Sequence, residues 1–167
     1  MNIFVLDPDP ETSARMMCDA HVVKMIVESC QLLSTHDRIT LGIGNDDDLR
    51  YKITHKNHPC RVCLLNSFNY LWLTIHLRGL LNEYTHRFGK VHKCFNMYKN
   101  LWEIDYNGCY NPYCTSFPKC MPDVCKVGGY SIEDIVKSYR LYYMSKQHTM
   151  CRFCYTNREM PEWLKGE

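Results

Sequence analysis

The sequence predicts a mainly α-helical protein, a compact single-domain helical bundle spanning residues 1–167. Three observations support this prediction. Three segments repeat apolar residues at helical spacing, only one short run near the N-terminus is extended and apolar, and no internal repeat or linker divides the chain. With 167 residues, of which 23% are charged, the chain has a globular composition and enough length for one hydrophobic core.

The extended run is NIFVL, residues 2–6, and it ends at the turn sequence DPDP. A first helix is expected over residues 12–34, because no Gly or Pro interrupts it and apolar residues cover most of its circumference. On this helix, four polar residues gather in one arc of about 80°: His21, Lys24, Glu28 and Gln31. We expect this arc to line a polar cleft. The alternative is a solvated edge on which Lys24 and Glu28 form an ordinary pair one turn apart.

Residues 36–57 form a polar connection and are expected to be a surface loop or lid. A long second helix is expected to begin at Pro59 and to end at Gly89, a residue type suited to a helix C-cap. The apolar stripe of this helix breaks at Arg78 and Gly79. At that point the helix kinks or another element packs closely against it.

The rest of the chain is predicted to hold one irregular segment and one helix. Residues 101–128 carry Gly, Pro and Cys without a clear period, so an irregular Cys-rich segment is expected. Ser131 and Asp134 have the spacing of a capping box, which predicts a third helix over about residues 132–147.

The eleven cysteines are not accompanied by a secretory signal, so we expect reduced thiols in an intracellular compartment rather than a disulfide framework. Two C-x-x-C pairs, Cys60/Cys63 and Cys151/Cys154, have the local spacing of zinc ligands. A further group has irregular spacing: Cys109, Cys114, Cys120 and Cys125. Packed free thiols are favoured and a structural zinc is the alternative, so we expect neither a metal nor a cofactor.

Charge is informative only locally, because the net charge is +2. Two stretches without acidic residues, 86–99 and 135–158, alternate cations with aromatic side chains, which is typical of nucleic-acid binding. The candidate substrate- or phosphate-binding residues in them are Arg87, Lys90, His92, Lys93, Tyr139, Arg140 and Tyr143. His58 is another candidate, because it precedes a predicted helix N-terminus, which attracts anions. The alternatives are a solvated basic rim for the stretches and an N-terminal cap for His58.

Several protein classes are disfavoured. No apolar run approaches 18 residues, so no membrane-spanning segment or membrane partner is expected. The P-loop, dinucleotide-binding and nucleophile-elbow motifs are all missing from the sequence, which argues against the enzymes built on them.

Some of the spacings and short motifs are shared with a known family: the spacing from Asp19 through His21 to Glu28, Lys56-Asn-His58-Pro59 with the preceding Tyr51-Lys52, the run from Tyr70 to Lys90, and Ser138 to Tyr143. Over residues 1–93, and more loosely in the third helix, the chain resembles the pyrimidine-dimer DNA glycosylases, the endonuclease V-type enzymes, with their phage and viral relatives. The resemblance implies an all-helical enzyme that flips a base out of damaged DNA and attacks the sugar C1′ with an amine, forming an imine. It also implies that His21 helps to hold the DNA and that Glu28 is the catalytic carboxylate.

The sequence departs from this family at the expected nucleophile. The best-known members use the α-amine of a threonine exposed by removal of Met, whereas here residue 2 is Asn2, before which Met1 is normally kept. The nucleophile is therefore expected to be the Met1 amine, or Lys24 with a pKa lowered by burial. Val27 also stands directly before Glu28, where an arginine is expected beside the carboxylate.

The predicted partner is DNA or a nucleotide, and the favoured function is a glycosylase/lyase-like activity on damaged or modified DNA. Glu28, His21 and Lys24 are the predicted catalytic residues. Two alternatives remain: an enzyme that acts on free or cyclic nucleotides, for example in viral counter-defence, and a non-catalytic module that binds nucleic acid.

Overall fold

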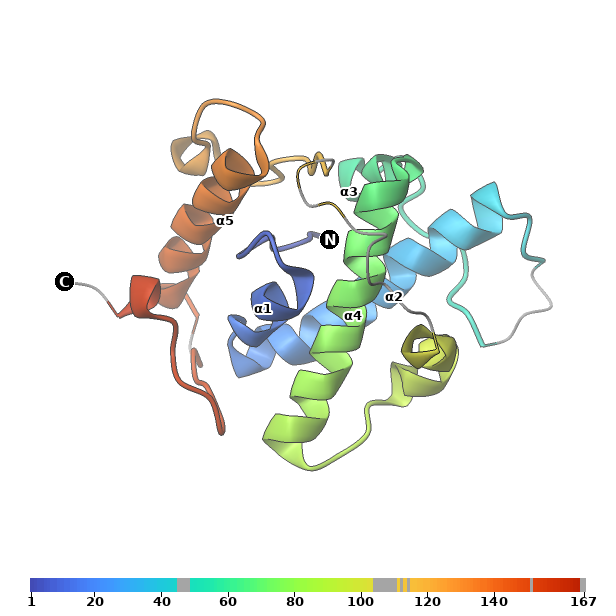
Figure 1. The fold of residues 1–167 in the computed structure, drawn as a ribbon, viewed down its shortest axis with the longest axis horizontal. Coiled ribbons are helices and arrows are strands. Elements are labelled where there is room, and N and C mark those ends of the chain that lie inside the picture. Colours follow the sequence, from blue (N-terminus) through green and yellow to red (C-terminus); the bar gives the residue numbers. More distant parts are fainter. Residues whose placement is uncertain (45–48, 104–110, 112, 114, 151, 166–167) are drawn as a thin grey trace.

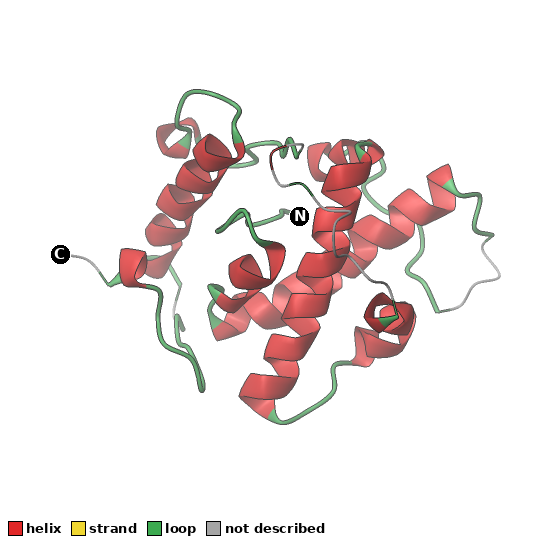
Figure 2. Cartoon of the chain, in the orientation of Figure 1, coloured by secondary structure: helices red, strands yellow, loops and turns green. Residues whose placement is uncertain are grey.

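The computed structural model describes residues 1–44, 49–103, 111, 113, 115–150 and 152–165. Helices make up the regular structure of these residues, and no strand occurs among them (Figure 2), which confirms the predicted mainly α-helical fold. The two longest helices, α2 (Asp19–Thr40) and α4 (Ser67–Phe88), cross and pack against each other (Figure 1). No helix in the described part of the chain has the length and apolar character needed to cross a bilayer.

The helix predicted over residues 12–34 is divided in two. A short helix, α1 (Pro10–Arg15), is followed by a turn, and α2 begins after Cys18, whose backbone is extended. The amide of Cys18 donates to the hydroxyl of Tyr143 (2.8 Å), and a carbonyl of the same turn accepts a hydrogen bond from Arg87. Hydrogen bonds to distant parts of the chain therefore replace the local bonds that would have continued one helix.

At its other end, α2 runs six residues beyond the predicted boundary, to Thr40. Polar side chains suggest a loop from His36 onward, but those of His36, Asp37 and Arg38 are buried here. The Asp37 carboxylate accepts a hydrogen bond from Tyr70 (2.9 Å), and the Arg38 guanidinium donates to the carbonyl of Tyr51 (2.9 Å). The loop that follows α2 is thereby fixed to it, although residues 45–48 of the predicted loop lie outside the described residues.

The predicted second helix is also divided. It consists of α3 (Pro59–Val62), the 3-10 turn η1 (Cys63–Leu65) and α4. Asn66 separates them, because its side-chain oxygen caps α4 by accepting the amide of Phe68 (2.8 Å). Gly89 ends α4 with a positive φ of 64°, which confirms the predicted C-cap.

The break in the apolar stripe of α4 marks a close contact with α1. A Cβ atom at Gly79 would lie 3.0 Å from the Cβ of Ala14 and 3.2 Å from the Cα of Glu11. Beside this contact, the Arg78 guanidinium bonds the Glu11 carboxylate at 2.9 Å. Of the two possibilities considered for this position, close packing of another element is therefore the one observed.

The capping box predicts α5 (Ile132–Gln147) correctly, since Ser131 and Asp134 bond each other's backbone amides. The shorter 3-10 segments are η2 (Lys93–Trp102), η4 (Asp123–Cys125) and η5 (Glu162–Leu164). In the described part of the predicted irregular segment, η4 and the end of η2 are the helical pieces; residues 104–110, 112 and 114 lie outside the described residues.

The extended N-terminal run lies between α5 on one side and α2 and α4 on the other (Figure 1). Ile3 to Leu6 are buried, and the Phe4 ring packs against the rings of His21 (4.9 Å between centroids) and Tyr143 (5.4 Å). The carbonyl of Leu6 accepts a hydrogen bond from Arg140 on α5 (2.8 Å). The chain therefore begins inside the fold, among residues of α2 and α5.

A buried ion-pair network centres on Arg87, whose side chain is 0% exposed. Its guanidinium bonds Glu83 (3.0 Å), Asp19 (3.0 Å) and two carbonyl groups of the turn between α1 and α2. Burial raises the pKa of Glu83, but hydrogen bonds from Arg158 and Arg87 outweigh that effect and lower it below its usual value. Asp19 is also bonded by the amide and hydroxyl of Thr156.

We predict that Arg87→Met lowers the free energy of unfolding by about 3–5 kcal/mol, because it leaves two carboxylates in the interior without their shared cation. Urea denaturation measures this loss. Arg78→Met is the matched control on the same helix, since its partly exposed pair with Glu11 should contribute about 1 kcal/mol or less. Equal losses in the two variants would contradict a central role for the Arg87 network.

Candidate active site

A polar cavity of about 200 Å³ lies where the N-terminal run meets α2 and α5. All three predicted catalytic residues, which come from one face of α2, line it. The full lining is Met1, Asn2, Phe4, His21, Lys24, Glu28, Cys120, Tyr142 and Lys146. The narrow polar arc of α2 therefore faces a cleft, as expected.

Glu28 is fixed by a bond to the start of the chain. One carboxylate oxygen accepts a hydrogen bond from the backbone nitrogen of Asn2 (2.9 Å), and the other lies 3.5 Å from the ammonium of Lys24. The Glu28 side chain is only 15% exposed. Because Met1 precedes Asn2 directly, this bond places the N-terminal amine one residue from a largely buried carboxylate.

His58 interacts electrostatically with the same amine and with Glu28. Burial lowers the pKa of His58, the α-ammonium of Met1 and His55 lower it further, and Glu28 raises it. The Nδ1 atom of His58 accepts the amide of Cys60 (3.2 Å), so His58 is the N-terminal cap of α3. Since α3 is a single turn, the predicted long helix with an anion site at its start is replaced by a cap beside the N-terminal amine.

His21 is buried at the inner end of the cavity. Its Nδ1 atom lies 2.8 Å from the hydroxyl of Tyr143, and its ring packs on Phe4. Burial lowers the pKa of His21 to about 4, and the positive charges of Lys146 and Lys24 contribute. The imidazole is therefore neutral at pH 7 and available to hydrogen bonds rather than to ion pairs.

The exposure of Lys24 argues against its expected role as a possible nucleophile. That role required burial, but its side chain is 64% exposed and its ammonium lies beside Glu28. Lys146 on α5 also lines the cavity, 4.5 Å above the ring of Tyr142. Lys146 and Tyr142 were not among the predicted site residues, although their spacing of four within the acid-free stretch 135–158 could have indicated them.

Three predicted phosphate-binding residues lie in the interior, so that assignment has to be corrected. Arg87 binds its carboxylates and carbonyls, and Tyr139 and Tyr143 are fully buried. The Tyr139 hydroxyl lies 2.7 Å from the carbonyl of Pro118 and 3.0 Å from the side-chain oxygen of Asn2. These tyrosines belong to the apolar face of α5, where they position the N-terminal run instead of contacting a substrate.

The remaining predicted contacts divide into bonded and exposed residues. Arg140 is held by the carbonyl of Leu6 and by Asp7 (3.3 Å). His92 caps η2 by accepting the amide of Cys94 (3.1 Å). Lys90 and Lys93 are exposed and follow the end of α4. That end of α4 lies at the lower edge of Figure 1, away from the N-terminus.

The positive charge of the two acid-free stretches is therefore partly neutralised in the folded protein. Acidic residues elsewhere in the chain pair with Arg87, Arg140 and Arg158, the last through Glu83 at 2.6 Å. A stretch without local acids does not by itself form a cationic surface, because the fold can supply the acids.

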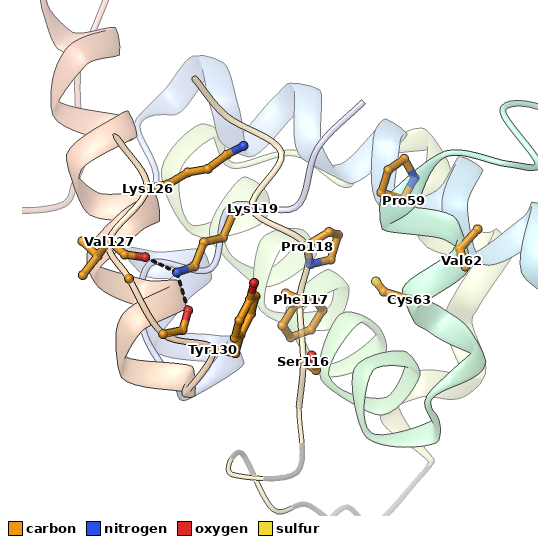
Figure 3. Close-up of a pocket in the computed structure, with 12 residues that line it drawn as sticks. Pro59, Val62, Cys63, Ser116, Phe117, Pro118, Lys119, Lys126, Val127 and Tyr130 are labelled. Carbon is orange, nitrogen blue, oxygen red and sulfur yellow. Dashed lines mark hydrogen bonds between the residues drawn. The ribbon is translucent and has the colours of Figure 1, made fainter. Parts of the chain in front are cut away.

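A larger cavity of about 680 Å³ lies behind the wall formed by residues 116–120 (Figure 3). Its lining is mainly apolar, with Phe117, Pro118 and Tyr130 among the residues drawn. The Lys119 ammonium is bonded to the carbonyls of Val127 and Gly129. The larger cavity has no carboxylate or imidazole among its lining residues, whereas the smaller cavity has both. We therefore do not propose the larger cavity as the catalytic site.

Two of the described cysteines from the C-x-x-C pairs contact groups outside their own pair. The Cys60 thiol contacts Cys120 (3.6 Å between sulfur atoms), whereas the Cys154 thiol contacts Asp19 (3.5 Å). Within the described ranges, no three His, Cys, Asp or Glu side chains are placed to hold a metal ion. Three cysteines of the proposed sets, Cys109, Cys114 and Cys151, lie outside the described residues.

Comparison with known proteins identifies the family. The family model for pyrimidine dimer DNA glycosylases matches residues 1–97, which is more than half of the chain, so the chain belongs to this family. The resemblance seen in the sequence is thereby confirmed, and with it a DNA glycosylase-like function at the level of the family, with DNA as the substrate. No match is found among curated proteins or among solved structures.

The family match covers six of the nine residues that line the cavity: Met1, Asn2, Phe4, His21, Lys24 and Glu28. The other three, Cys120 and the α5 residues Tyr142 and Lys146, lie beyond the match. The residues that face the carboxylate across the cavity are therefore contributed by the unmatched part of this chain.

We predict that His21 stays neutral in the folded protein down to about pH 4. Its folded pKa lies below the ordinary value of 6.5, so stability from this residue is complete above pH 6.5 and is lost as the pH falls from 6.5 to 4. The loss is roughly 3 kcal/mol, at 1.36 kcal/mol for each pKa unit. NMR titration of the His21 ring measures the pKa, and protonation near pH 6.5 would contradict the prediction.

Proposed function

We propose that this protein is a DNA glycosylase/lyase that removes a base from damaged or modified DNA through an imine on the α-amine of Met1. The observation that carries the proposal is the hydrogen bond from the Asn2 backbone nitrogen to Glu28 (2.9 Å). This bond holds the start of the chain against a carboxylate at the wall of a polar cavity. Family membership supplies DNA as the substrate.

In the proposed reaction, the unprotonated α-amine attacks C1′ of the deoxyribose. The bond from C1′ to the base breaks, and the base departs with the electron pair and takes up a proton. Opening of the sugar ring and loss of the proton on nitrogen then give the imine. A carboxylate at the position of Glu28 stabilises the positive charge that develops at the sugar and can accept the proton from the amine.

The α-amine is favoured over Lys24 as the nucleophile on two grounds. An α-amine ordinarily has a pKa about 2–3 units below that of a lysine, so a far larger fraction is unprotonated at neutral pH. A lysine can match this only when burial or a neighbouring cation disfavours its charge. Lys24 lacks the burial that this requires, since its side chain is 64% exposed and its ammonium lies 3.5 Å from Glu28.

The cations around the cavity suit the phosphates beside the reacting nucleotide. Lys24 on α2 and Lys146 on α5 line the cavity with the carboxylate, and Lys146 lies over the ring of Tyr142, which stacks with Phe4 (5.9 Å between centroids). Lys90, His92 and Lys93 remain proposed contacts to the DNA backbone outside the cavity. We propose that Lys24 acts here as a phosphate-binding residue and as a partner of Glu28.

We predict that Glu28→Gln lowers the incision of duplex DNA containing a cyclobutane pyrimidine dimer by on the order of a hundredfold or more, because it removes the charge that stabilises the developing cation. Gel analysis of a labelled duplex measures incision, and the undamaged duplex is the substrate control. The melting temperature should stay near that of the wild type, since Gln is isosteric with Glu and can still accept the Asn2 amide.

The matched variant is Glu133→Gln on the exposed side of α5, which makes the same chemical change away from the cavity and should keep full incision. If Glu28→Gln retains full incision, the proposed site is wrong. If the wild type turns over mononucleotides and ignores the damaged duplex, an enzyme of free nucleotides is the better description.

A further inference from the structure

We propose that Cys60 and Cys120 form a reversible disulfide bond, and that this bond displaces the N-terminal residues from Glu28 and switches off the site. The effect on activity rests on the function proposed above, whereas formation of the bond does not. The inference comes from the sulfur–sulfur contact, from the accessibility of Cys120 in the cavity and from the hydrogen bonds that link its backbone to Asn2.

The two sulfur atoms lie 3.6 Å apart, with the Cys60 thiol donating to Cys120. A disulfide needs a sulfur–sulfur distance of about 2.05 Å, so roughly 1.5 Å of approach closes the bond. Cys60 lies in the single turn of α3, and Cys120 lies in residues 115–120, which contain no helix. The irregular segment can shift toward α3 without breaking a helical hydrogen-bond ladder.

The two thiols differ in reactivity in the way that such a reaction requires. The hydrogen bond from Cys60 lowers the pKa of Cys120 to about 7 against the opposing effect of burial, and the charges of Lys126 and the α-ammonium of Met1 add to the lowering. The same hydrogen bond, together with burial, raises the pKa of Cys60. Cys120 is therefore the attacking thiolate and Cys60 the resolving thiol.

The oxidant is a low-molecular-weight disulfide such as oxidised glutathione. The Cys120 thiolate attacks one of its sulfur atoms, the sulfur–sulfur bond breaks, and one glutathione thiolate leaves. Cys60 gives up its proton to that thiolate and attacks the Cys120 sulfur, which expels the second glutathione as a thiolate; this thiolate takes from water the proton that Cys120 had lost. The protein pair loses two electrons and two protons, and the oxidant is reduced to two thiols.

The bond would act on the site through Asn2. The Asn2 side-chain amide donates to the carbonyl of Cys120 (3.0 Å), while its backbone nitrogen donates to Glu28 (2.9 Å). The Asn2 side-chain oxygen is also within 3.0 Å of the Tyr139 hydroxyl. Movement of Cys120 toward α3 therefore pulls on the residue that holds the α-amine beside the carboxylate.

The neighbouring Cys63 provides a comparison. Its thiol donates to the carbonyl of Cys60 (3.2 Å) instead of contacting Cys120, and it lines the larger cavity (Figure 3). Burial raises the pKa of Cys63 to about 12, and the pKa of Cys60 is raised as well, so the contact with Cys120 and not the pKa distinguishes the two thiols. Cys63→Ser is thus the matched control for Cys60→Ser, one turn away in the same part of the chain.

The test begins with the reduced full-length chain, which is treated with oxidised glutathione, alkylated at its free thiols and mapped by peptide mass spectrometry. We expect a bridge between Cys60 and Cys120 that dithiothreitol reverses, in the wild type and in Cys63→Ser. Cys60→Ser, or Cys60→Ala if the serine variant does not fold, should stop at a mixed disulfide between Cys120 and glutathione. Alkylation of both Cys60 and Cys120 in the treated wild type overturns the proposal.

Two further readouts test the switch. Oxidised wild type should lose incision by about ten- to a hundredfold, as expected for a displacement of about 1 Å at a reacting group, and reduction should restore it. The rate at which the Met1 α-amine is acylated can be measured by mass spectrometry. This rate should change when the wild type or Cys63→Ser is oxidised. If no form of the chain incises DNA, the proposed function fails while the peptide map and the acylation rates still decide this proposal. A mapped bridge that alters neither incision nor acylation overturns the switch.

Discussion

The guanidinium of Arg87 lies in the interior, where it bonds carboxylates from two different helices and carbonyl groups of the turn between α1 and α2. A buried charge is tolerated only when its partners surround it, so these groups have to meet at one point. Asp19 and Glu83 in turn hold Thr156 and Arg158, which brings the C-terminal residues to the same place. The network thus joins the start of α2, the end of α4 and the C-terminal segment.

The interactions at the start of α2 determine the direction in which its polar face points. His21, Lys24 and Glu28, which come just after Asp19, are separated from one another by three and four residues, so they lie on one side of the helix. The hydroxyl of Tyr143 bonds the Cys18 amide just before the helix and contacts His21 on it, which sets that side toward α5. The N-terminal run fills the space between the two helices, and its first residues meet Glu28. The geometry of the cavity therefore depends on interactions far from it.

The sequence was informative where the determining interactions are local. Helical periodicity located the long helices, and the capping box at Ser131 gave the exact start of α5. Gly89 was identified as a C-cap because its backbone conformation depends only on the end of its own helix. The polar arc on α2 was also visible, since periodicity alone places its residues on one side.

Interactions between distant residues could not be predicted. The break at Cys18 depends on Tyr143 and Arg87, which are 125 and 69 residues further along the chain. Arg87 sits in a stretch without acids, and its carboxylates come from Asp19 and from Glu83 one turn before it. The tyrosines of α5 have both a polar tip and an apolar ring, and only the packing shows that the rings face inward.

The central claim is that an N-terminal amine beside Glu28 forms the covalent bond to DNA. The most direct measurement is to react the full chain with duplex DNA containing a pyrimidine dimer in the presence of sodium borohydride, which reduces an imine to a stable amine. Peptide mass spectrometry then locates the linked sugar. The account predicts one adduct, on the α-amine of Met1. An adduct on Lys24 or another lysine side chain, or incision without any adduct, would contradict it.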